Sequence, residues 1–367
     1  MRPAGPRAVV SALEPELLSA VGTFDPAYAS PCWQREGHSL GCLPAFYILS
    51  PHQAGGKSLY AAITGHPQVV SAHNPHTQFW SGEHMTMPEY AAAFDASAAR
   101  AAADPRLLIG DASEQTLTYY YAQNMRGHRR WSAVVPACFD GCARNHTDQA
   151  APAFVECAEE CWRRGERAHA EHARAVGAPG REALKVPLMM RAAYKASPPR
   201  LVVLLREPTE RLHSAFYEYG QYRDRYGDSP EGEIKFVEDQ VGALERCARK
   251  QITKDRGKAG ARQSDGDGAG GPMLPAERRC ALVFESLGYE EERVFFHCDQ
   301  VLRGLYALYL EQWLALWPRD RVLLLLSEDW FQRPRQTLAR VTSFLGLPGD
   351  VAADDALWRR LRAAEVI

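Results

Sequence analysis

Residues 45–50 (AFYILS) form a short apolar run that ends at a turn rich in proline and glycine. The turn covers residues 51–58 (PHQAGGKS), and a helical pattern follows it. A strand, a glycine-rich turn and a helix in this order are the local arrangement of a phosphate-binding loop. Four further apolar runs alternate with helical patterns: residues 68–72, 106–110, 201–205 and 322–326. This alternation predicts an α/β fold with a P-loop-type parallel sheet flanked by helices.

The charge and hydrophobicity of the chain argue against two classes of protein. The 43 Lys and Arg residues nearly balance the 45 Asp and Glu residues, so the formal net charge is −2. A chain with this balance has no general attraction for nucleic acid, and any anion site must be local. No apolar run reaches the roughly 18 residues that a membrane span needs. We therefore expect neither a nucleic-acid partner nor a membrane span in this chain.

The distribution of apolar residues predicts one large domain over residues 40–350. The residues before it (1–39) show no clear strand and are interpreted as an N-terminal extension, and the residues after it (351–367) as a C-terminal tail. Two stretches interrupt the α/β pattern. A Cys-rich helical insertion is expected over residues 136–165. A flexible loop is expected over residues 254–276, where Gly, Asp and Lys dominate and large apolar residues are almost absent.

Four of the nine cysteines lie in the insertion as two pairs, each one helical turn apart: Cys138 with Cys142, and Cys157 with Cys161. If the two helices pack antiparallel, the bridges are Cys138–Cys161 and Cys142–Cys157, which we expect; a zinc site that includes His146, or free thiols, are the alternatives. Asn145 begins a glycosylation sequon, which suits a secreted or lumenal protein. Another bridge is expected within one group of cysteines: Cys247, Cys280 and Cys298.

The turn after the first strand is a candidate anion site. Gly55 and Gly56 let the backbone bend tightly, so that several N–H groups and the N-terminus of the next helix point at one anion. Lys57 adds a charge and Ser58 a hydroxyl. The nucleotide-kinase pattern G-x-x-x-x-G-K-[ST] is matched only in part, because Pro51 stands where its first glycine belongs. The candidate ligand-binding residues of the turn are Gln53, Ala54, Gly55, Gly56, Lys57 and Ser58.

A second candidate anion site follows the clearest strand, residues 201–205. Arg206 stands at the carboxyl end of this strand, the edge at which open α/β sheets bind ligands. Pro208 suits the first turn of the helix that follows, and Arg211 and Ser214 lie three residues apart on one face of it. Arginines beside a hydroxyl form a good receptor for a second phosphate group.

With these two anion sites the chain resembles the carbohydrate sulfotransferases that use 3′-phosphoadenosine 5′-phosphosulfate (PAPS). The resemblance is strongest to the branch that adds 6-sulfate to N-acetylgalactosamine 4-sulfate in chondroitin or dermatan. The stretches that carry it are residues 42–48 (CLPAFYI), 66–67 (HP), 110–113 (GDAS), 204–214 (LLREPTERLHS), 302–306 (LRGLY), 313–314 (WL), 328–329 (ED) and 344–347 (FLGL). Residues 40–350 would then be the sulfotransferase domain.

The resemblance implies roles for particular residues. The 53–58 turn would bind the 5′-phosphosulfate of PAPS, Arg206 and Ser214 would bind its 3′-phosphate, and three residues would close over the nucleotide: Arg303, Gly304 and Tyr306. The reaction would be in-line transfer of the sulfuryl group to a carbohydrate hydroxyl, for example on a sulfated polysaccharide of the glycosaminoglycan type. The resemblance implies that no metal takes part. It also implies a glycoprotein of the Golgi lumen or another secretory compartment.

Two positions depart from the family pattern. Gln53 stands where the family places a lysine, so that Lys57 is the candidate to supply that charge. Asn74 stands where related enzymes place a catalytic glutamate, and asparagine cannot accept the proton of the acceptor. The base would then be His76, or else His73 or Asp111.

Two alternative functions stay open at this level. A P-loop kinase would use residues 56–58 as its phosphate loop and Asp111 as the ligand of magnesium. A catalytically impaired descendant would bind nucleotide or glycan without transferring sulfate, as Gln53 and Asn74 suggest. Metal-dependent ATP turnover separates the kinase from the sulfotransferase.

Overall fold

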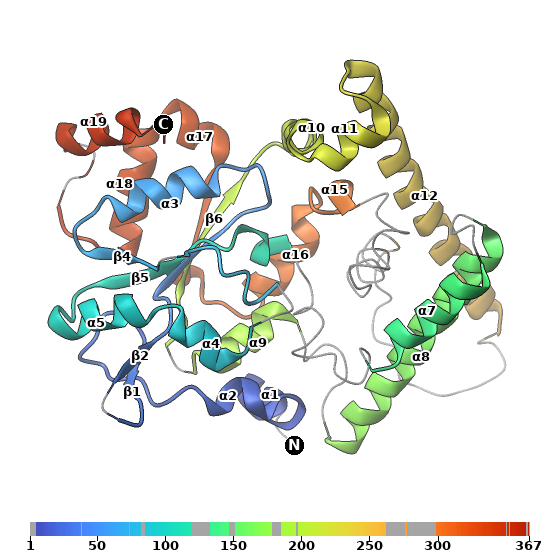
Figure 1. The fold of residues 1–367 in the computed structure, drawn as a ribbon, viewed down its shortest axis with the longest axis horizontal. Helices are drawn as coiled ribbons and strands as arrows, with labels where there is room; N and C mark the ends of the chain where they lie inside the picture. Colours follow the sequence, from blue (N-terminus) through green and yellow to red (C-terminus); the bar gives the residue numbers. More distant parts are fainter. Residues whose placement is uncertain are drawn as a thin grey trace. The chain divides into compact units, whose positions relative to one another are not determined.

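The computed structural model describes most of the chain (Figure 1). The described residues are 5–37, 39–72, 74–81, 85–118, 133–146, 151–177, 185–195, 197–261, 276, 280, 299–349, 351, 353–364 and 366. They form two compact units, each of which is described by itself. The first unit consists of Met1–Arg130, Ala168–Glu207 and Tyr309–Ile367, and the second of Trp131–Arg167 and Pro208–Leu308.

The first unit is built on a five-stranded parallel sheet with the order β4-β5-β3-β6-β7. The strands in chain order are β3 (Phe46–Leu49), β4 (Val69–Ser71), β5 (Leu108–Asp111), β6 (Arg200–Leu205) and β7 (Val322–Leu326). All four residues of the central strand β3 are buried. Its run is continuously apolar because both faces of the sheet are covered, as in other parallel sheets. The predicted α/β fold with a parallel sheet flanked by helices is confirmed.

Helices from distant parts of the chain cover one face of the sheet. These are α3 (Gly56–Thr64), α18 (Pro334–Leu345) and α19 (Asp355–Ala363). Their buried side chains join Ile48 and Leu204 of the sheet in a single apolar cluster. This cluster anchors the start of α3, so the turn before α3 has a rigid support.

Tyr47, between two residues that face the apolar cluster, points to the opposite face. Its hydroxyl lies 2.8 Å from the hydroxyl of Tyr90 and 2.7 Å from that of Tyr194. The Tyr90 hydroxyl in turn donates to Asp111 at 3.0 Å. All four side chains are fully buried, so this face is held together by a hydrogen-bonded network as well as by apolar contacts.

The remaining elements of the first unit are short. They are α1 (Pro6–Leu13), α2 (Pro15–Ser19), β1 (Cys32–Gln34), β2 (Leu40–Cys42), α4 (Met87–Ala92), α5 (Asp95–Ala103), η1 (Glu114–Thr118), α9 (Val186–Ala193), η3 (Arg319–Arg321), α17 (Ser327–Gln332) and α16 (Tyr306–Leu314), which begins in the second unit. α16 begins two residues after Gly304, where the chain turns.

Both ends of the chain are more ordered than the sequence indicates. α1 packs on α9, where Arg7 Nη1 donates to the carbonyl of Ala192 at 3.2 Å. β1 pairs antiparallel with β2, and the Cys32–Cys42 disulfide joins them. At the other end, Trp358 of α19 is buried in the main core. The interpretation of residues 1–39 as lacking a strand is therefore wrong, and residues 351–367 include a core helix.

The second unit is helical. Its elements are α7 (Val135–Asn145), α8 (Pro152–Ala175, whose last residues belong to the first unit), α10 (Pro208–Glu218), α11 (Gly220–Tyr226), α12 (Pro230–Ala261) and α15 (Asp299–Leu302). Phe216, Tyr222 and Phe236 pack together in its interior. Since α12 continues through Ala261, the first part of the loop expected over residues 254–276 is helical. The rest of that loop, apart from Ala276, lies outside the described residues.

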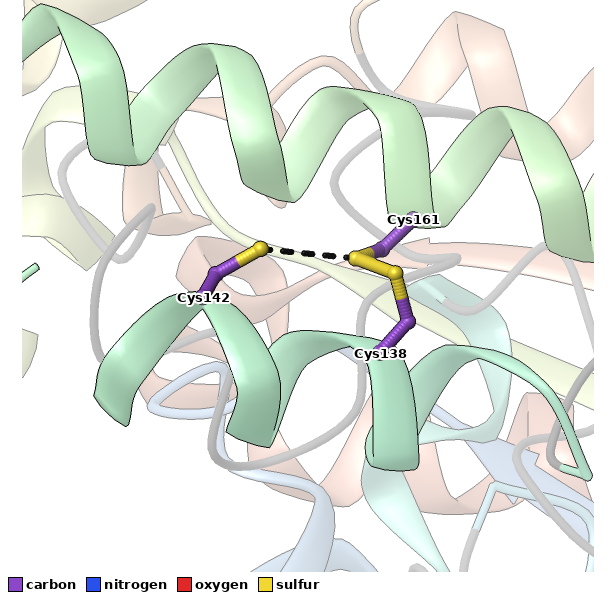
Figure 2. Close-up of side chains that lie close together, drawn as sticks. All are labelled: Cys138, Cys142 and Cys161. Atoms are coloured by element: carbon purple, nitrogen blue, oxygen red, sulfur yellow. Dashed lines mark hydrogen bonds between the residues drawn. A yellow bond between two sulfur atoms is a disulfide. The ribbon is translucent and has the colours of Figure 1, made fainter. Parts of the chain in front are cut away.

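The Cys-rich insertion is a helical hairpin, α7 and α8, closed by two disulfides: Cys138–Cys161 and Cys142–Cys157. Figure 2 shows the first bridge, with Sγ of Cys142 only 3.5 Å from Sγ of Cys161. Phe139 and Phe154 pack edge to face beside the bridges. The predicted pairing is confirmed. The four sulfurs form two disulfides, so they are not available as thiolate ligands of a zinc ion. A fourth bridge joins Cys247 to Cys280, and Cys298 lies outside the described residues.

Candidate anion-binding site

The 51–58 turn leads from the buried end of β3 into α3 and has an unusual backbone. Gly55 has a φ of 84° and Gln53 a φ of 66°. Glycine adopts this left-handed conformation at little cost, whereas glutamine is strained in it. Strained residues of this kind concentrate at ligand sites, where the surrounding structure holds them in place.

The start of α3 approaches its neighbours so closely that glycine is required there. A Cβ atom on Gly56 would collide with Ser50 Oγ and lie 2.9 Å from Glu114 Oε1. A Cβ on Gly55 would lie 2.8 Å from Cζ of Phe331. The first N–H groups of a helix have no partner within the helix, so they need a side chain, a water molecule or a ligand as acceptor.

Glu114 already occupies part of this space. The N–H of Lys57 donates to its Oε1 at 2.9 Å, and His52 Nδ1 lies 3.6 Å from its Oε2. Burial raises the pKa of the Glu114 carboxyl, while the charge and N–H of Lys57 and the charge of His76 oppose that rise. An anionic side chain bound at this amide indicates that the N-terminus of α3 accepts an anion.

Glu114 is absent from the residues singled out in the sequence. It follows the GDAS run, residues 110–113, which begins within β5. β5 lies beside β3 in the sheet. Because the carboxyl ends of parallel strands meet at one edge, the residues after β5 and the turn after β3 come together there. The position of Glu114 just after β5, the strand beside β3, is the feature of the sequence that indicates its place at the turn.

Arg206 reaches the same turn from the end of β6. Its Nη1 donates to the main-chain carbonyl of Gln53 at 2.9 Å. The contact follows from the sheet, since β6 pairs with β3 and Val203 lies opposite Leu49. The structure thus brings the predicted turn and the predicted arginine together, although 153 positions separate them in the chain.

Other residues of the turn are held by α17. The hydroxyl of Ser58 donates to the Gly55 carbonyl at 3.0 Å and accepts from Trp330 Nε1 at 2.8 Å. The carbonyl of the buried Ala54 accepts from Ser327 Oγ. The hydroxyl of Ser58 therefore braces the turn in this structure. The side chain of Lys57 is exposed at its surface.

His76 is half-buried and has a defined orientation. Its Nδ1 lies 2.7 Å from the carbonyl oxygen of Ala112. A carbonyl can only accept, so Nδ1 carries the proton, and in the neutral ring Nε2 has a free lone pair. Such an imidazole can accept a proton at Nε2. His73, the other histidine considered from the sequence, lies outside the described residues.

Asp111 is placed differently from the other candidate bases. It is fully buried and accepts hydrogen bonds from Tyr90 Oη at 3.0 Å, Thr77 Oγ1 at 3.0 Å and the Ser113 N–H at 2.7 Å. Burial raises its pKa against the effect of these hydrogen bonds. Asp111 thus joins the end of β5 to the loop that carries His76, and its oxygens are already used.

The second unit contains the remaining predicted site residues. Ser214 lies on α10, three residues after Arg211, whose buried guanidinium donates to Gln300 Oε1 at 3.0 Å. Arg303 Nε pairs with Asp299 Oδ1 at 2.7 Å. Gly304 and Tyr306 follow at the break before α16, where a Cβ on Gly304 would lie 3.4 Å from Cβ of Pro208.

Comparison with known protein families finds a match to part of the chain. Residues 181–362 match the family model described as "Sulfotransferase domain". The matched segment includes β6, Arg206 and β7. The match supports sulfuryl transfer by a sulfotransferase in general, and PAPS is the sulfate donor that such a domain implies.

No curated protein matches the chain. Among solved structures, a crystal structure of a sulfotransferase from Alicyclobacillus acidocaldarius aligns with a TM-score of 0.40 and 16% sequence identity, over 89% of this chain and 93% of that one. The fold class itself is established by the strand order and helices described above.

Proposed function

We propose that the protein transfers the sulfuryl group of PAPS to a hydroxyl group of a carbohydrate, such as a glycosaminoglycan of the chondroitin or dermatan type. The observation that carries the proposal is the contact of Arg206 with the 53–58 turn at the N-terminus of α3. This contact places the guanidinium against the backbone of the turn that leads from β3 into α3, so the two anion sites expected from the sequence meet at one edge of the sheet.

One observation besides charge supports a phosphosulfate group at the turn. Ser50 Oγ is buried close to Gly56 without a hydrogen-bond partner among the described residues. Gln53, Ala54 and Ser58 shape the turn, while Lys57 supplies a charge at its rim. For the 3′-phosphate we propose Arg206 and Ser214, and for the nucleotide Arg303, Gly304 and Tyr306.

In the proposed reaction His76 Nε2 accepts the proton of the acceptor hydroxyl. The hydroxyl oxygen bonds to sulfur as the bond from sulfur to the 5′-phosphate oxygen breaks, and adenosine 3′,5′-bisphosphate is the product. Lys57 and the amides of the turn stabilise the charge that develops on the leaving phosphate. We propose that no metal is needed, because these groups supply the positive charge.

The kinase alternative is not favoured. Its proposed magnesium ligand, Asp111, is fully buried and accepts three hydrogen bonds. Its proposed phosphate-loop hydroxyl, Ser58, is held between Gly55 and Trp330.

We also propose a secretory location, in the Golgi lumen, for a glycoprotein modified at Asn145. The four disulfides are consistent with the secretory pathway, where thiols are oxidised. Asn145 is exposed at the end of α7. Among the described helices, none has both the length and the hydrophobicity to cross a membrane.

Thermal unfolding with added ligands tests the proposal. Adenosine 3′,5′-bisphosphate should raise the unfolding midpoint, because a ligand that binds only the folded state stabilises it, whereas ATP with magnesium should not. Sulfate transfer from PAPS to chondroitin or dermatan should persist in EDTA. A midpoint shift with ATP and magnesium alone would overturn the proposal, and bisphosphate binding without transfer to any acceptor would indicate a protein that has lost catalysis.

A further inference from the structure

We propose that Glu114 sets the preference of the anion site for donor over product: its carboxylate weakens binding of a terminal 5′-phosphate more than binding of a 5′-phosphosulfate. The inference rests on the proposed sulfuryl transfer and assigns a role in product release to a residue of the same site.

The first step is the position of the carboxylate. Glu114 Oε1 accepts the N–H of Lys57 at 2.9 Å, at the N-terminus of α3. The groups that face Glu114 with a charge or a titratable ring are Lys57, His52 and His76. An external phosphate that binds the first amides of α3 must take the same N–H or bind directly beside the carboxylate.

Ser50 provides an independent observation that points to a ligand at the same place. Ser50 is fully buried, and its Oγ has no hydrogen-bond partner among the described residues. This hydroxyl lies against the backbone of Gly56, the first residue of α3. Glu114 therefore satisfies one donor of the site and leaves a second one for the oxygen of a ligand.

The third step is the change of ligand charge during the reaction. In the donor the 5′-phosphate and the sulfate bonded to it carry one negative charge each. When the bond between sulfur and the bridging oxygen breaks, the phosphate retains the electron pair and becomes a terminal group with a charge of about −1.5 to −2 at pH 7. The sulfate takes its own charge away, so the total charge of the 5′ group changes little, but the charge on the phosphate beside Glu114 grows. The repulsion between this phosphate and the nearly buried Glu114 carboxylate therefore grows, and little solvent is present to screen it.

Binding measurements on the chain of 367 residues test this inference. We would determine by calorimetry the Kd of adenosine 3′,5′-bisphosphate and of PAPS, without acceptor, for the wild type and for Glu114→Gln. Glutamine retains the size of the side chain and can accept the Lys57 N–H, so it removes only the charge. Glu114→Asp retains the charge, and Glu16→Gln removes an exposed carboxylate from the first turn of α2 as a matched control.

We expect Glu114→Gln to tighten bisphosphate binding at least tenfold and PAPS binding less than threefold, with Glu16→Gln close to the wild type. Glu114→Asp, which retains the charge, should not tighten bisphosphate binding. Equal tightening of both ligands, or no change in either, overturns the role of Glu114 and leaves the proposed function intact. Failure of all four proteins to bind either ligand overturns the proposed function itself. An unfolding midpoint close to that of the wild type confirms that each variant is folded.

Discussion

The guanidinium of Arg206 donates a hydrogen bond to the main-chain carbonyl of Gln53 at 2.9 Å. The contact joins the end of β6 to the turn after β3, and Gln53 is held there with a positive φ. A backbone conformation that glutamine adopts reluctantly is thus fixed by a charged side chain from a neighbouring strand. The most constrained part of the turn is also the part at which the proposed phosphosulfate would bind.

Replacing Arg206 by alanine should weaken binding of adenosine 3′,5′-bisphosphate by roughly 10- to 100-fold, since a charge-assisted hydrogen bond contributes about 1.5–3 kcal/mol. Calorimetric titration measures the effect. Arg106→Ala, which removes an exposed arginine paired with Asp104, is the matched control and should leave the Kd unchanged. An unaltered Kd for Arg206→Ala would exclude this arginine from the nucleotide site.

Lys57→Ala should lower the turnover of sulfate transfer by roughly 10²- to 10³-fold if Lys57 supplies the charge that Gln53 lacks. The thermal midpoint should change little, because the side chain is exposed. Lys57→Arg should retain part of the activity. Steady-state kinetics provide the measurement, and a normal rate for the alanine variant would show that stabilisation comes from the backbone amides alone.

His76→Ala should reduce kcat by about 10²- to 10⁴-fold, the range for loss of a general base. The Kd of the bisphosphate should stay within a factor of two, since His76 bonds to the Ala112 carbonyl and not to the 53–58 turn. If kcat were unchanged while PAPS binding weakened, His76 would be a binding residue and the base would have to be sought elsewhere.

Asp111 should make the free energy of unfolding fall as the pH rises. Burial raises its pKa in the folded state above the ordinary value of 3.8. A carboxyl whose pKa is raised by folding stabilises the fold fully below its unfolded pKa, and this contribution is lost as the pH rises through the folded pKa. Asp111→Asn should therefore flatten the fall in unfolding free energy above pH 4, as measured by urea denaturation with disulfides intact. A steeper fall in the variant would contradict the assignment.

The Cys32–Cys42 bridge should stabilise the N-terminal segment. The bridge restricts the unfolded chain. For its sequence separation of 10, the lost chain entropy corresponds to a stabilisation of about 2.7 kcal/mol. Cys32→Ser with Cys42→Ser should lower the free energy of unfolding by about that amount, as measured by urea denaturation. Non-reducing mass spectrometry of the wild type should find residues 32 and 42 linked, and two free thiols at these positions would contradict the structure.

The features that the sequence predicts correctly are those with a local physical signature. β3 and β6 are continuous apolar runs bounded by turn residues, and only a sheet covered on both faces buries such runs. The hairpin bridges follow from a spacing of four, which places both sulfurs of each helix on one face. The role of each site residue stays a prediction.

The features that the sequence does not reveal depend on contacts between distant segments. Cys32 and Cys42 meet because two three-residue strands pair, and strands this short show no alternation of apolar residues. Glu114 looks like an ordinary acidic residue until the pairing of β3 with β5 brings it to the start of α3. The role proposed for it depends on a neighbour, Lys57, that no local pattern connects to it.

The hydrogen bond from Trp330 Nε1 to Ser58 Oγ couples the turn to an intrinsic fluorophore. Trp330 is fully buried, and its indole contacts a residue of the proposed ligand site directly. Any anion that draws the Ser58 hydroxyl toward itself would change the polarity sensed by this ring. The difference in fluorescence between the wild type and Trp330→Phe during a titration would then report occupancy of the turn, with no label attached to the protein.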